Sequence, residues 1–255
     1  MKLLIWGIGG RLGKTLLEDA RKKDYITDIA GFDKFAKKTD FSNINIFNSI
    51  NEINDSFDVI IDFSKPDAIN DLLPYAIKTK TPIVIATTGH SEDQLKMIKD
   101  TSKQIPIFKT TNMSLGVNLL IELVKKACEV LGESYDIEII EQHHNIKVDS
   151  PSGTAATIAE EINKVYNNSK NFVYGRHSAN EKRNINDIGI HSVRGGSVIG
   201  KHEVLFLGND EFITLKHEAQ SKSIFTEGAL KASQFLITKK NGFYSMSDLL
   251  NDILK

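Results

Sequence analysis

Residues 141–155 combine groups that move protons with a turn that can receive an anion. Two imidazoles and an amine, at His143, His144 and Lys147, can hold or release a proton near neutral pH when burial or neighbouring charge adjusts their pKa. Residues 151–154 then supply proline, glycine and hydroxyl groups where a helix would begin, and the unpaired N–H groups of a helix start attract carboxylates and phosphates. The run therefore predicts proton donation to an anionic substrate.

The elements on either side must position these groups. Residues 135–140 alternate and are rich in β-branched apolar side chains, which predicts a strand, and residues 155–166 carry apolar residues at helical spacing. Each group also has an ordinary explanation, because either histidine could be a structural ring and Lys147 a solvated loop lysine. Their combination favours an active site.

The composition limits the classes of protein that the chain can belong to. With 255 residues and 40% hydrophobic content it can build one large or two modest domains with a real core. A net charge of −1 argues against nonspecific binding to nucleic acid or anionic membrane. Cys128 alone cannot form an internal disulfide, and adjacent histidines with no third ligand at convincing spacing indicate no metal site. No signal-peptide core develops after Met1, so we expect a cytoplasmic protein.

The first residues predict a dinucleotide site. The apolar run 3–6 is followed by glycines at 7, 9, 10 and 13 and then by a helical pattern, which is the order strand, glycine turn, helix. A tight turn without a ligand remains the alternative. The turn residues that we expect at the cofactor are Gly7, Ile8, Gly9, Gly10, Arg11 and Leu12.

The next apolar run, residues 26–32, ends at Asp33, where such a unit places an acidic residue against the adenine ribose. A carboxylate favours NADH, and the adjacent Lys34 can accept the 2′-phosphate of NADPH, so we expect tolerance of both. A solvated loop of charges is the alternative.

Further apolar runs at residues 59–63, 83–86 and 105–108 alternate with helical patterns, which predicts a Rossmann-type, doubly wound parallel sheet. Ligands lie beyond the carboxyl ends of such strands. The polar and small residues there extend the predicted cofactor site, although each could serve the turn alone. They are Ala86, Thr87, Thr88, Thr110, Thr111, Asn112 and Met113.

A second domain is predicted from the remaining elements. A helix over residues 118–131 precedes the strand that ends at Glu141, and strand candidates follow at 188–193, 202–207 and 212–217, a mixed sheet in an α+β domain. The polar segment 167–186 predicts a mobile excursion. We expect a dinucleotide-binding domain over residues 1–112, completed by helices within about 225–255, and a substrate-binding and oligomerisation domain over 113–224.

Several of these motifs together resemble the 4-hydroxy-tetrahydrodipicolinate reductase family, formerly called dihydrodipicolinate reductase, over the whole chain. The most specific is the His-His-x-x-Lys-x-Asp-x-Pro-Ser-Gly-Thr-Ala motif that begins at His143. The segments that carry the resemblance are residues 7–13, 61–66, 87–89, 112–118, 141–155 and 193–202.

This resemblance implies an oxidoreductase of lysine and diaminopimelate biosynthesis. Its reaction would be the reduction of 4-hydroxy-tetrahydrodipicolinate to tetrahydrodipicolinate by NADH or NADPH, with loss of water. It also implies proton donation by His143 and Lys147 and binding of a substrate carboxylate by His144, Gly153 and Thr154. A homotetramer formed through the second-domain sheet is implied as well.

The chain departs from the family at a few positions. Ala86 stands where many relatives have glycine, Asp33 and Lys34 replace the Glu-Arg pair of some members, and Lys222 replaces an arginine. Lysine keeps that arginine's charge but loses its bidentate geometry.

Two other functions remain as alternatives. One is another two-domain nicotinamide-dependent dehydrogenase, acting on an amino-acid semialdehyde or a cyclic polyol, which the motif at His143 disfavours. The other is a dinucleotide-binding sensor that recognises a partner through its second domain, which would leave the motif without a task.

Overall fold

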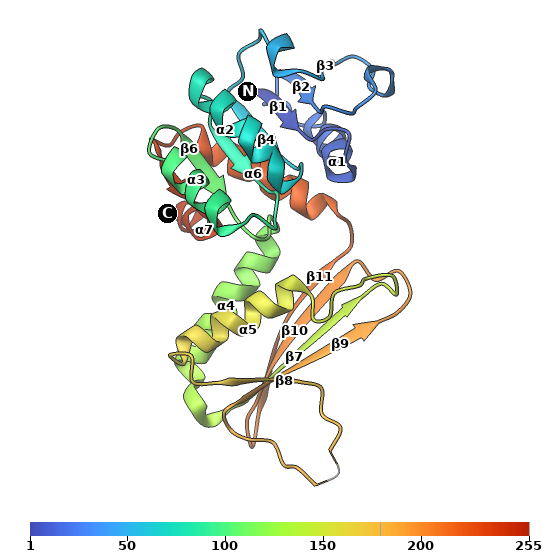
Figure 1. Ribbon diagram of the computed structural model, residues 1–255. Helices are drawn as coiled ribbons and strands as arrows, with labels where there is room; N and C mark the ends of the chain where they lie inside the picture. The colour runs from blue at the N-terminus through green and yellow to red at the C-terminus, as the bar shows by residue number, and fades with distance from the viewer. Residues whose placement is uncertain (179, 255) are drawn as a thin grey trace. The chain divides into compact units, whose positions relative to one another are not determined.

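A computed structural model describes residues 1–178 and 180–254, which divide into two compact units (Figure 1). Unit 1 comprises Met1–Leu115 and Lys222–Lys255 of the chain, and unit 2 comprises Gly116–Ser221. None of the helices in the described ranges is long and apolar enough to cross a membrane.

Unit 1 is built on a parallel sheet in the order β12-β6-β5-β4-β1-β2-β3. The order β3-β2-β1-β4-β5-β6 is that of a dinucleotide-binding doubly wound sheet, which confirms the predicted fold class. Its strands are β1 (Lys2–Trp6), β2 (Asp28–Phe32), β3 (Asn45–Phe47), β4 (Val59–Asp62), β5 (Ile83–Ile85), β6 (Pro106–Lys109) and β12 (Gly242–Tyr244).

Helices cover both faces of this sheet because its strands are apolar on both sides. In β1, Leu3 and Ile5 belong to one buried cluster, whereas Leu4 and Trp6 belong to another. The first cluster packs against α1 (Arg11–Ala20), α6 (Ser223–Leu236) and α7 (Met246–Ile253), and the second against α2 (Ile69–Thr79) and α3 (Glu92–Thr101). The carboxy-terminal helices α6 and α7 thus share a core with the amino-terminal strands. The single-turn 3₁₀ helices are η1 (Lys38–Asp40), η2 (Ile50–Glu52), η3 (Pro66–Ala68) and η4 (Gly132–Ser134).

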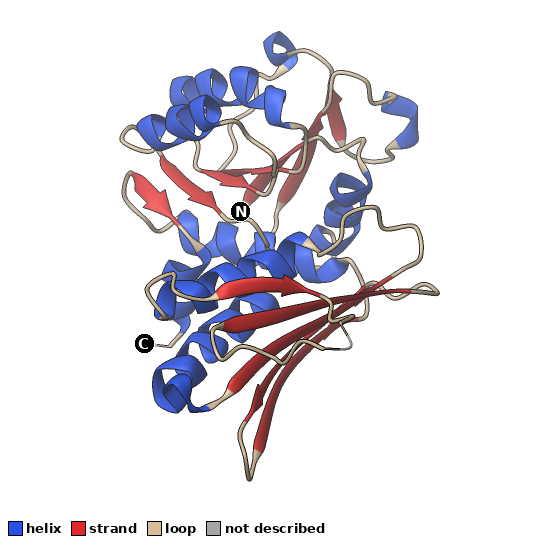
Figure 2. Cartoon of the chain, turned by 60° about the horizontal axis from the view of Figure 1, so that its bottom comes forward, coloured by secondary structure: helices blue, strands red, loops and turns tan. Residues whose placement is uncertain are grey.

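Unit 2 contains a mixed sheet in the order β11-β10-β7-β9-β8, as the sequence predicted. β7 pairs antiparallel with β10 and parallel with β9. Its strands are β7 (Asp136–His143), β8 (Asn171–Tyr174), β9 (Asp187–Arg194), β10 (Gly200–Leu207) and β11 (Phe212–Ala219). The helices α4 (Leu115–Leu131) and α5 (Gly153–Val165) pack on one face of this sheet, where they share one apolar core with β7, β9 and β10 (Figure 2).

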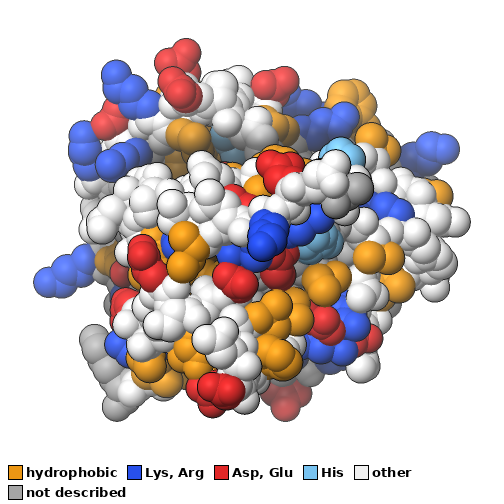
Figure 3. Space-filling model, turned by 90° about the horizontal axis from the view of Figure 1, so that it is seen from below, with side chains coloured by type: hydrophobic (Ala, Val, Ile, Leu, Met, Phe, Trp, Pro, Cys, Tyr) orange, Lys and Arg blue, Asp and Glu red, His pale blue; other side chains and the backbone are white. Residues whose placement is uncertain are grey.

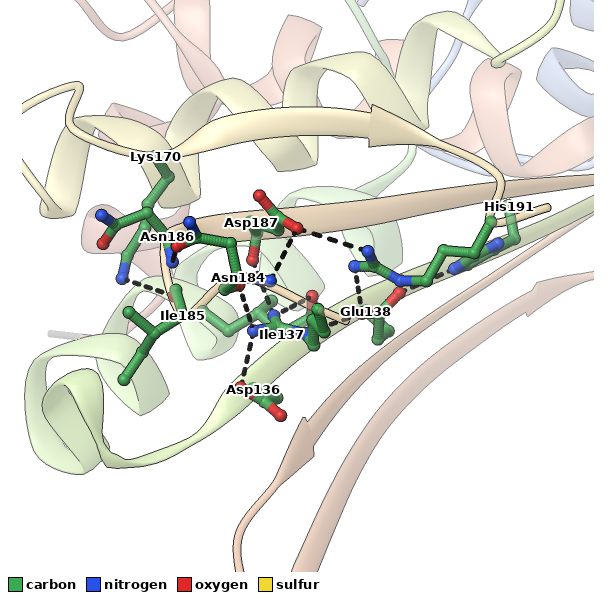
Figure 4. A network of polar contacts seen from close by, with 11 residues as sticks. Asp136, Ile137, Glu138, Lys170, Asn184, Ile185, Asn186, Asp187 and His191 are labelled. Carbon is green, nitrogen blue, oxygen red and sulfur yellow. Dashed lines mark hydrogen bonds and ion pairs between the residues drawn. The ribbon is translucent and has the colours of Figure 1, made fainter. Parts of the chain in front are cut away.

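The described part of segment 167–186, for which the sequence predicts a mobile excursion, makes specific contacts with the sheet. It contains β8, which pairs with β9, and its two arginines are tied to carboxylates of the sheet (Figure 4). Arg183 donates to Asp136 at 2.6 Å and to Glu138 at 3.1 Å, and Arg176 donates to Glu138 at 2.9 Å. The segment is polar because it packs over a row of carboxylates, and a polar sequence alone does not distinguish that from a solvated loop.

Acidic and basic side chains are interspersed on the face shown in Figure 3 rather than gathered by sign. This agrees with the formal charge of −1.

Candidate active site

The proton-transfer run begins on the buried face of β7. Alternate residues of this strand are buried, so Glu141 and His143 point to the same side as the core residue Ile139, towards α4 and α5. Glu141 has no exposed surface, and His143 is 8% exposed. The strand therefore carries a carboxylate and an imidazole at positions where the pattern calls for apolar side chains.

Glu141 is surrounded by donors. Arg194 donates from both terminal nitrogens, at 2.8 Å to Oε2 and 2.7 Å to Oε1, and the backbone N–H of Ser152 donates to Oε1 at 3.1 Å. The Nδ1 atom of His143 lies 2.6 Å from Oε2. Burial alone would raise the pKa of Glu141, but the hydrogen bonds from Arg194 and its other neighbours outweigh burial and lower it to about 2. The carboxylate is therefore ionised at neutral pH.

The same contact decides the tautomer of His143. An ionised carboxylate can only accept a hydrogen bond, so Nδ1 carries the hydrogen of the neutral ring and Nε2 holds the lone pair. Burial lowers the pKa of His143, and the charges of Lys147 and Arg194 lower it further, against the opposing effect of Glu141. His143 is thus a neutral imidazole at pH 7.

The loop after β7 is fastened at both ends. Asn145 donates to the carbonyl of Gly196 at 3.2 Å, and Arg194 donates to the carbonyl of Asp149 at 2.6 Å. Within the loop, the Nζ atom of Lys147 lies 2.8 Å from Asp149, and the lysine side chain is 21% exposed. Lys147 is therefore held near the site.

The turn at residues 151–154 leads into a capped helix. Ser152 caps α5 by accepting a hydrogen bond from the backbone of Ala155 at 3.2 Å, and the helix begins at Gly153. A Cβ atom added to Gly153 would meet nothing within 4 Å, so space is open beside its backbone. Thr154 follows in the first turn. The Nδ1 atom of His144 is buried and has no hydrogen-bond partner within the part of the chain that the structure describes.

A second buried histidine adjoins this turn. The Nε2 atom of His202 lies 2.9 Å from the hydroxyl of Ser152, and its ring packs edge-on to His143 at a centroid distance of 5.2 Å. Burial, with the neighbouring His143, lowers the pKa of His202 to about 4. His202 is consequently neutral and supports the cap without adding charge.

The glycine turn of unit 1 is as compact as its sequence requires. Gly7 has a φ of +85°, and a Cβ atom there would lie 2.8 Å from the carbonyl oxygen of Phe63. A Cβ atom at Gly13 would lie 2.3 Å from the carbonyl oxygen of Gly7, so helix α1 can approach the turn only without a side chain there. Gly10 precedes α1 without a side-chain cap, which leaves its amino-terminal N–H groups for a phosphate.

A cleft of about 750 Å³ opens beside this turn. Its lining includes five residues for which the sequence predicts cofactor binding: Gly7, Gly9, Gly10, Asp33 and Lys34. Asp33 accepts hydrogen bonds from the backbone of Gly9 at 3.0 Å and of Phe35 at 2.9 Å. The carboxylate is thus fixed at the end of β2.

Three residues predicted for the turn do not line the cleft. The side chain of Ile8 is fully buried, that of Arg11 is exposed, and Leu12 lies between these extremes. Ile8 packs so closely on β2 that a Cβ atom at Gly31 would lie 2.4 Å from it.

The predicted residues after β5 and β6 follow the carboxyl ends of these strands and lie at the same end of the sheet, because the two strands are parallel neighbours. They do not line the cleft beside the glycine turn. Thr110 and Asn112 close a turn there, through a bond from the Thr110 hydroxyl to the Asn112 carbonyl at 3.1 Å. The residues concerned are Ala86, Thr87, Thr88, Thr110, Thr111, Asn112 and Met113.

Two family models, described as the N-terminus and the C-terminus of dihydrodipicolinate reductase, match residues 1–113 and 116–250. The chain belongs to this family. The 4-hydroxy-tetrahydrodipicolinate reductase of Caldanaerobacter subterraneus subsp. tengcongensis is 48% identical over 250 residues, 98% of each chain, and that of Clostridium novyi is 43% identical over 249 residues, again 98% of each.

A solved structure of the family has the same fold. The dipicolinate-bound dihydrodipicolinate reductase from Paenisporosarcina sp. TG-14 is 22% identical, with a TM-score of 0.79 over 96% of this chain and 97% of that one. The predicted family, its oxidoreductase class and its use of NADH or NADPH are confirmed by these similarities.

Sequence reasoning missed the partners that hold this family motif in place. Glu141, Arg194, Ser152 and His202 converge from β7, β9, the α5 cap and β10, and Ser152 was predicted only as part of the helix start, with no individual role predicted for the other three. One signal was present. A glutamate in phase with Ile137 and Ile139 occupies a core position, and a buried carboxylate requires a cation or several donors.

Proposed function

We propose that Lys147 and His143 handle the proton in the reaction of this chain, the NAD(P)H-dependent reduction of 4-hydroxy-tetrahydrodipicolinate to tetrahydrodipicolinate with loss of water. When bound, the cofactor supplies a hydride to C4 of the substrate. Hydride arriving at a conjugated imine builds electron density that must be protonated. The observation that carries the proposal is the neutral, carboxylate-oriented His143 beside Lys147 and the start of α5.

Lys147 is the proton donor in this proposal. A neutral His143 with its hydrogen directed at Glu141 offers a lone pair at Nε2 and no second proton. The ammonium group of Lys147 has protons to give, and it is held by Asp149 at 2.8 Å. His143 then binds the substrate or relays a proton.

The substrate carboxylate is received at the start of α5. Gly153 and Thr154 belong to the first turn, where backbone N–H groups and the positive end of the helix dipole favour an anion. The ring of His144, whose buried Nδ1 atom has no hydrogen-bond partner among the described residues, supplies a further polar contact. This assignment gives the motif its second task, which is to grip the substrate.

The residues of unit 1 fit a dinucleotide. The missing side chains at Gly7 and Gly13 make room for the tight turn, and the open N-terminus of α1 suits a pyrophosphate. We assign the turn residues from Gly7 to Leu12 to the phosphates. Ile8, Arg11 and Leu12, whose side chains do not line the cleft, would contact the phosphates through their backbone. Asp33 and Lys34 are assigned to the adenine ribose, and Ala86–Thr88 and Thr110–Met113 to the rest of the cofactor.

These assignments make unit 1 the dinucleotide-binding domain and unit 2 the substrate-binding domain. We further propose that unit 2 forms a homotetramer through its sheet and that the enzyme works in the cytoplasm. Both proposals are supported by the family resemblance.

The reaction is tested by a coupled assay. Fresh substrate is generated from pyruvate and aspartate semialdehyde by the upstream synthase, and loss of NADH or NADPH absorbance is followed after the purified chain is added. Turnover with at least one cofactor is expected. Absence of turnover with both would refute the proposed reaction.

A further inference from the structure

Glu141 is shared between two parts of the site. Its Oε2 atom contacts Nδ1 of His143 at 2.6 Å, and its Oε1 atom accepts the backbone N–H of Ser152 at 3.1 Å. His143 belongs to the proton-transfer run, whereas Ser152 is the cap from which α5 begins. One buried side chain thus connects the imidazole to the turn that receives the carboxylate.

We propose that Glu141 is a positioning residue, which fixes the Nδ1–H tautomer of His143 and the placement of its ring relative to the first turn of α5. This inference rests on the proposed function of the site. A fully buried carboxylate is costly unless charge and hydrogen bonds compensate it, and here the compensation comes from Arg194, His143, the backbone of Ser152 and the side chain of Ser192.

Arg194 connects Glu141 to the loop that carries Lys147. It forms a two-pronged pair with Glu141 and also donates to the carbonyl of Asp149 at 2.6 Å, so the charge that neutralises Glu141 also restrains the loop carrying Lys147. The fixed ring has room at its other nitrogen, because Gly200 has no side chain and a Cβ atom there would lie 3.1 Å from Nε2 of His143.

Glu141→Gln distinguishes this role from a merely structural ion pair. If the amide nitrogen replaced Oε1, it would face two donors, Arg194 and the backbone of Ser152. If it replaced Oε2, it would face the donors of Arg194 and His143. The conflict with His143 would be relieved if Nδ1 of that ring became an acceptor. The second orientation is favoured, so the variant should convert His143 to the Nε2–H tautomer.

The tautomer is read by ¹⁵N NMR of histidine-labelled protein, with the His143 signal assigned by its loss in His143→Gln. The unaltered protein is expected to show Nδ1–H and Glu141→Gln to show Nε2–H. The variant's kcat should fall on the order of 100-fold with its Kd for NADH unchanged, since orientation of a catalytic histidine by a carboxylate is worth factors of this size or more.

Glu138→Gln is the matched control. Glu138 lies on the same strand, on the opposite face, and contacts a histidine and arginines in the same way, with Nε2 of His191 at 2.7 Å (Figure 4). This variant should leave the His143 signal unchanged.

An Nε2–H tautomer in the unaltered protein overturns the inference, and that measurement needs no variant to fold. Unchanged tautomer and kcat in a folded Glu141→Gln protein overturn it as well. The NMR readout requires no turnover, so failure of the proposed reaction in the coupled assay is a separate result.

Discussion

His143 and Lys147 are close in sequence and differ in what they can do with a proton. The ring of His143 is buried, which lowers its pKa, and its one hydrogen is committed to Glu141. Lys147 lies on a loop and remains one-fifth exposed. The proposed function accordingly assigns orientation to the imidazole and proton donation to the amine.

Lys147→Ala tests that division. We expect kcat to fall about 10²- to 10⁴-fold, the usual contribution of a positioned acid, while the Kd for NADH stays the same. Steady-state kinetics and fluorescence titration give the two values. Lys164→Ala is the control, because Lys164 is an exposed lysine of α5 paired only with Glu161 among the described residues. Near-normal kcat in Lys147→Ala would remove the lysine from the donor role.

Glu141 should also shape the acid stability of the protein. Its pKa falls from 4.5 to about 2 in the folded chain, so the unfolded chain takes up a proton first. The stability from this ionised group is present above pH 4.5 and is lost as the pH falls to about 2, on the order of 3 kcal/mol in all. We therefore expect the difference in the free energy of unfolding between the unaltered protein and Glu141→Gln, measured by urea unfolding, to become smaller from pH 7 to pH 3. A constant difference would contradict the depressed pKa.

At the scale of elements, the amino-terminal turn of α5 has open space beside its backbone. Gly153 is exposed and has space beside it, while Ser152 behind it is buried and bonded to β7 and β10. The helix start is thus anchored on its inner side and available on its outer side.

Gly153→Ala exploits this geometry. The added methyl group meets no described protein atom within 4 Å. The free energy of unfolding should therefore be unchanged or higher by at most about 1 kcal/mol. The methyl group enters the space assigned to the substrate carboxylate, and we expect the KM for substrate to rise with the Kd for NADH unaffected. An unchanged KM would mean that the carboxylate binds elsewhere.

The loop after β2 contains Lys34, which the proposed function assigns to the adenine ribose. Lys34 is paired with Asp71 of α2 at 2.6 Å, so its charge is shared before a 2′-phosphate arrives. Asp71→Asn should release Lys34 and improve NADPH binding relative to NADH by roughly tenfold, whereas Lys34→Ala should weaken NADPH selectively. Calorimetric titration with both cofactors measures the ratio. Equal changes for the two cofactors would exclude contact between Lys34 and the 2′-phosphate.

The elements that were predicted and those that were missed differ in length and pattern. In the amino-terminal half, apolar runs alternate with helical patterns, and this order alone indicated the doubly wound sheet. β3 and β12 have three residues each, which is too few for a periodic signal. β12 joins the sheet by pairing with β6, a strand far from it in sequence. β8 was not predicted because it lies in a polar segment, whose arginines donate hydrogen bonds to Glu138 of β7.

At the scale of the whole molecule, sequence gave the candidate residues but not their arrangement. The run 141–155 is continuous, so its members could be read together, whereas Arg194 and His202 come from distant strands and meet Glu141 and Ser152 only after the sheet has formed. The boundary between the units at Leu115 and Gly116 coincides with the division between the two family models at residues 113 and 116, whereas the second model also matches residues 222–250, which belong to unit 1.

The most direct test of this account follows the hydride itself. The purified chain is given freshly generated substrate and NADH deuterated at C4 on the transferred side, and the product is analysed by mass spectrometry. The account predicts that deuterium appears in tetrahydrodipicolinate as NADH is consumed. Tetrahydrodipicolinate without deuterium, or no product with either side of NADH or NADPH labelled, would contradict it.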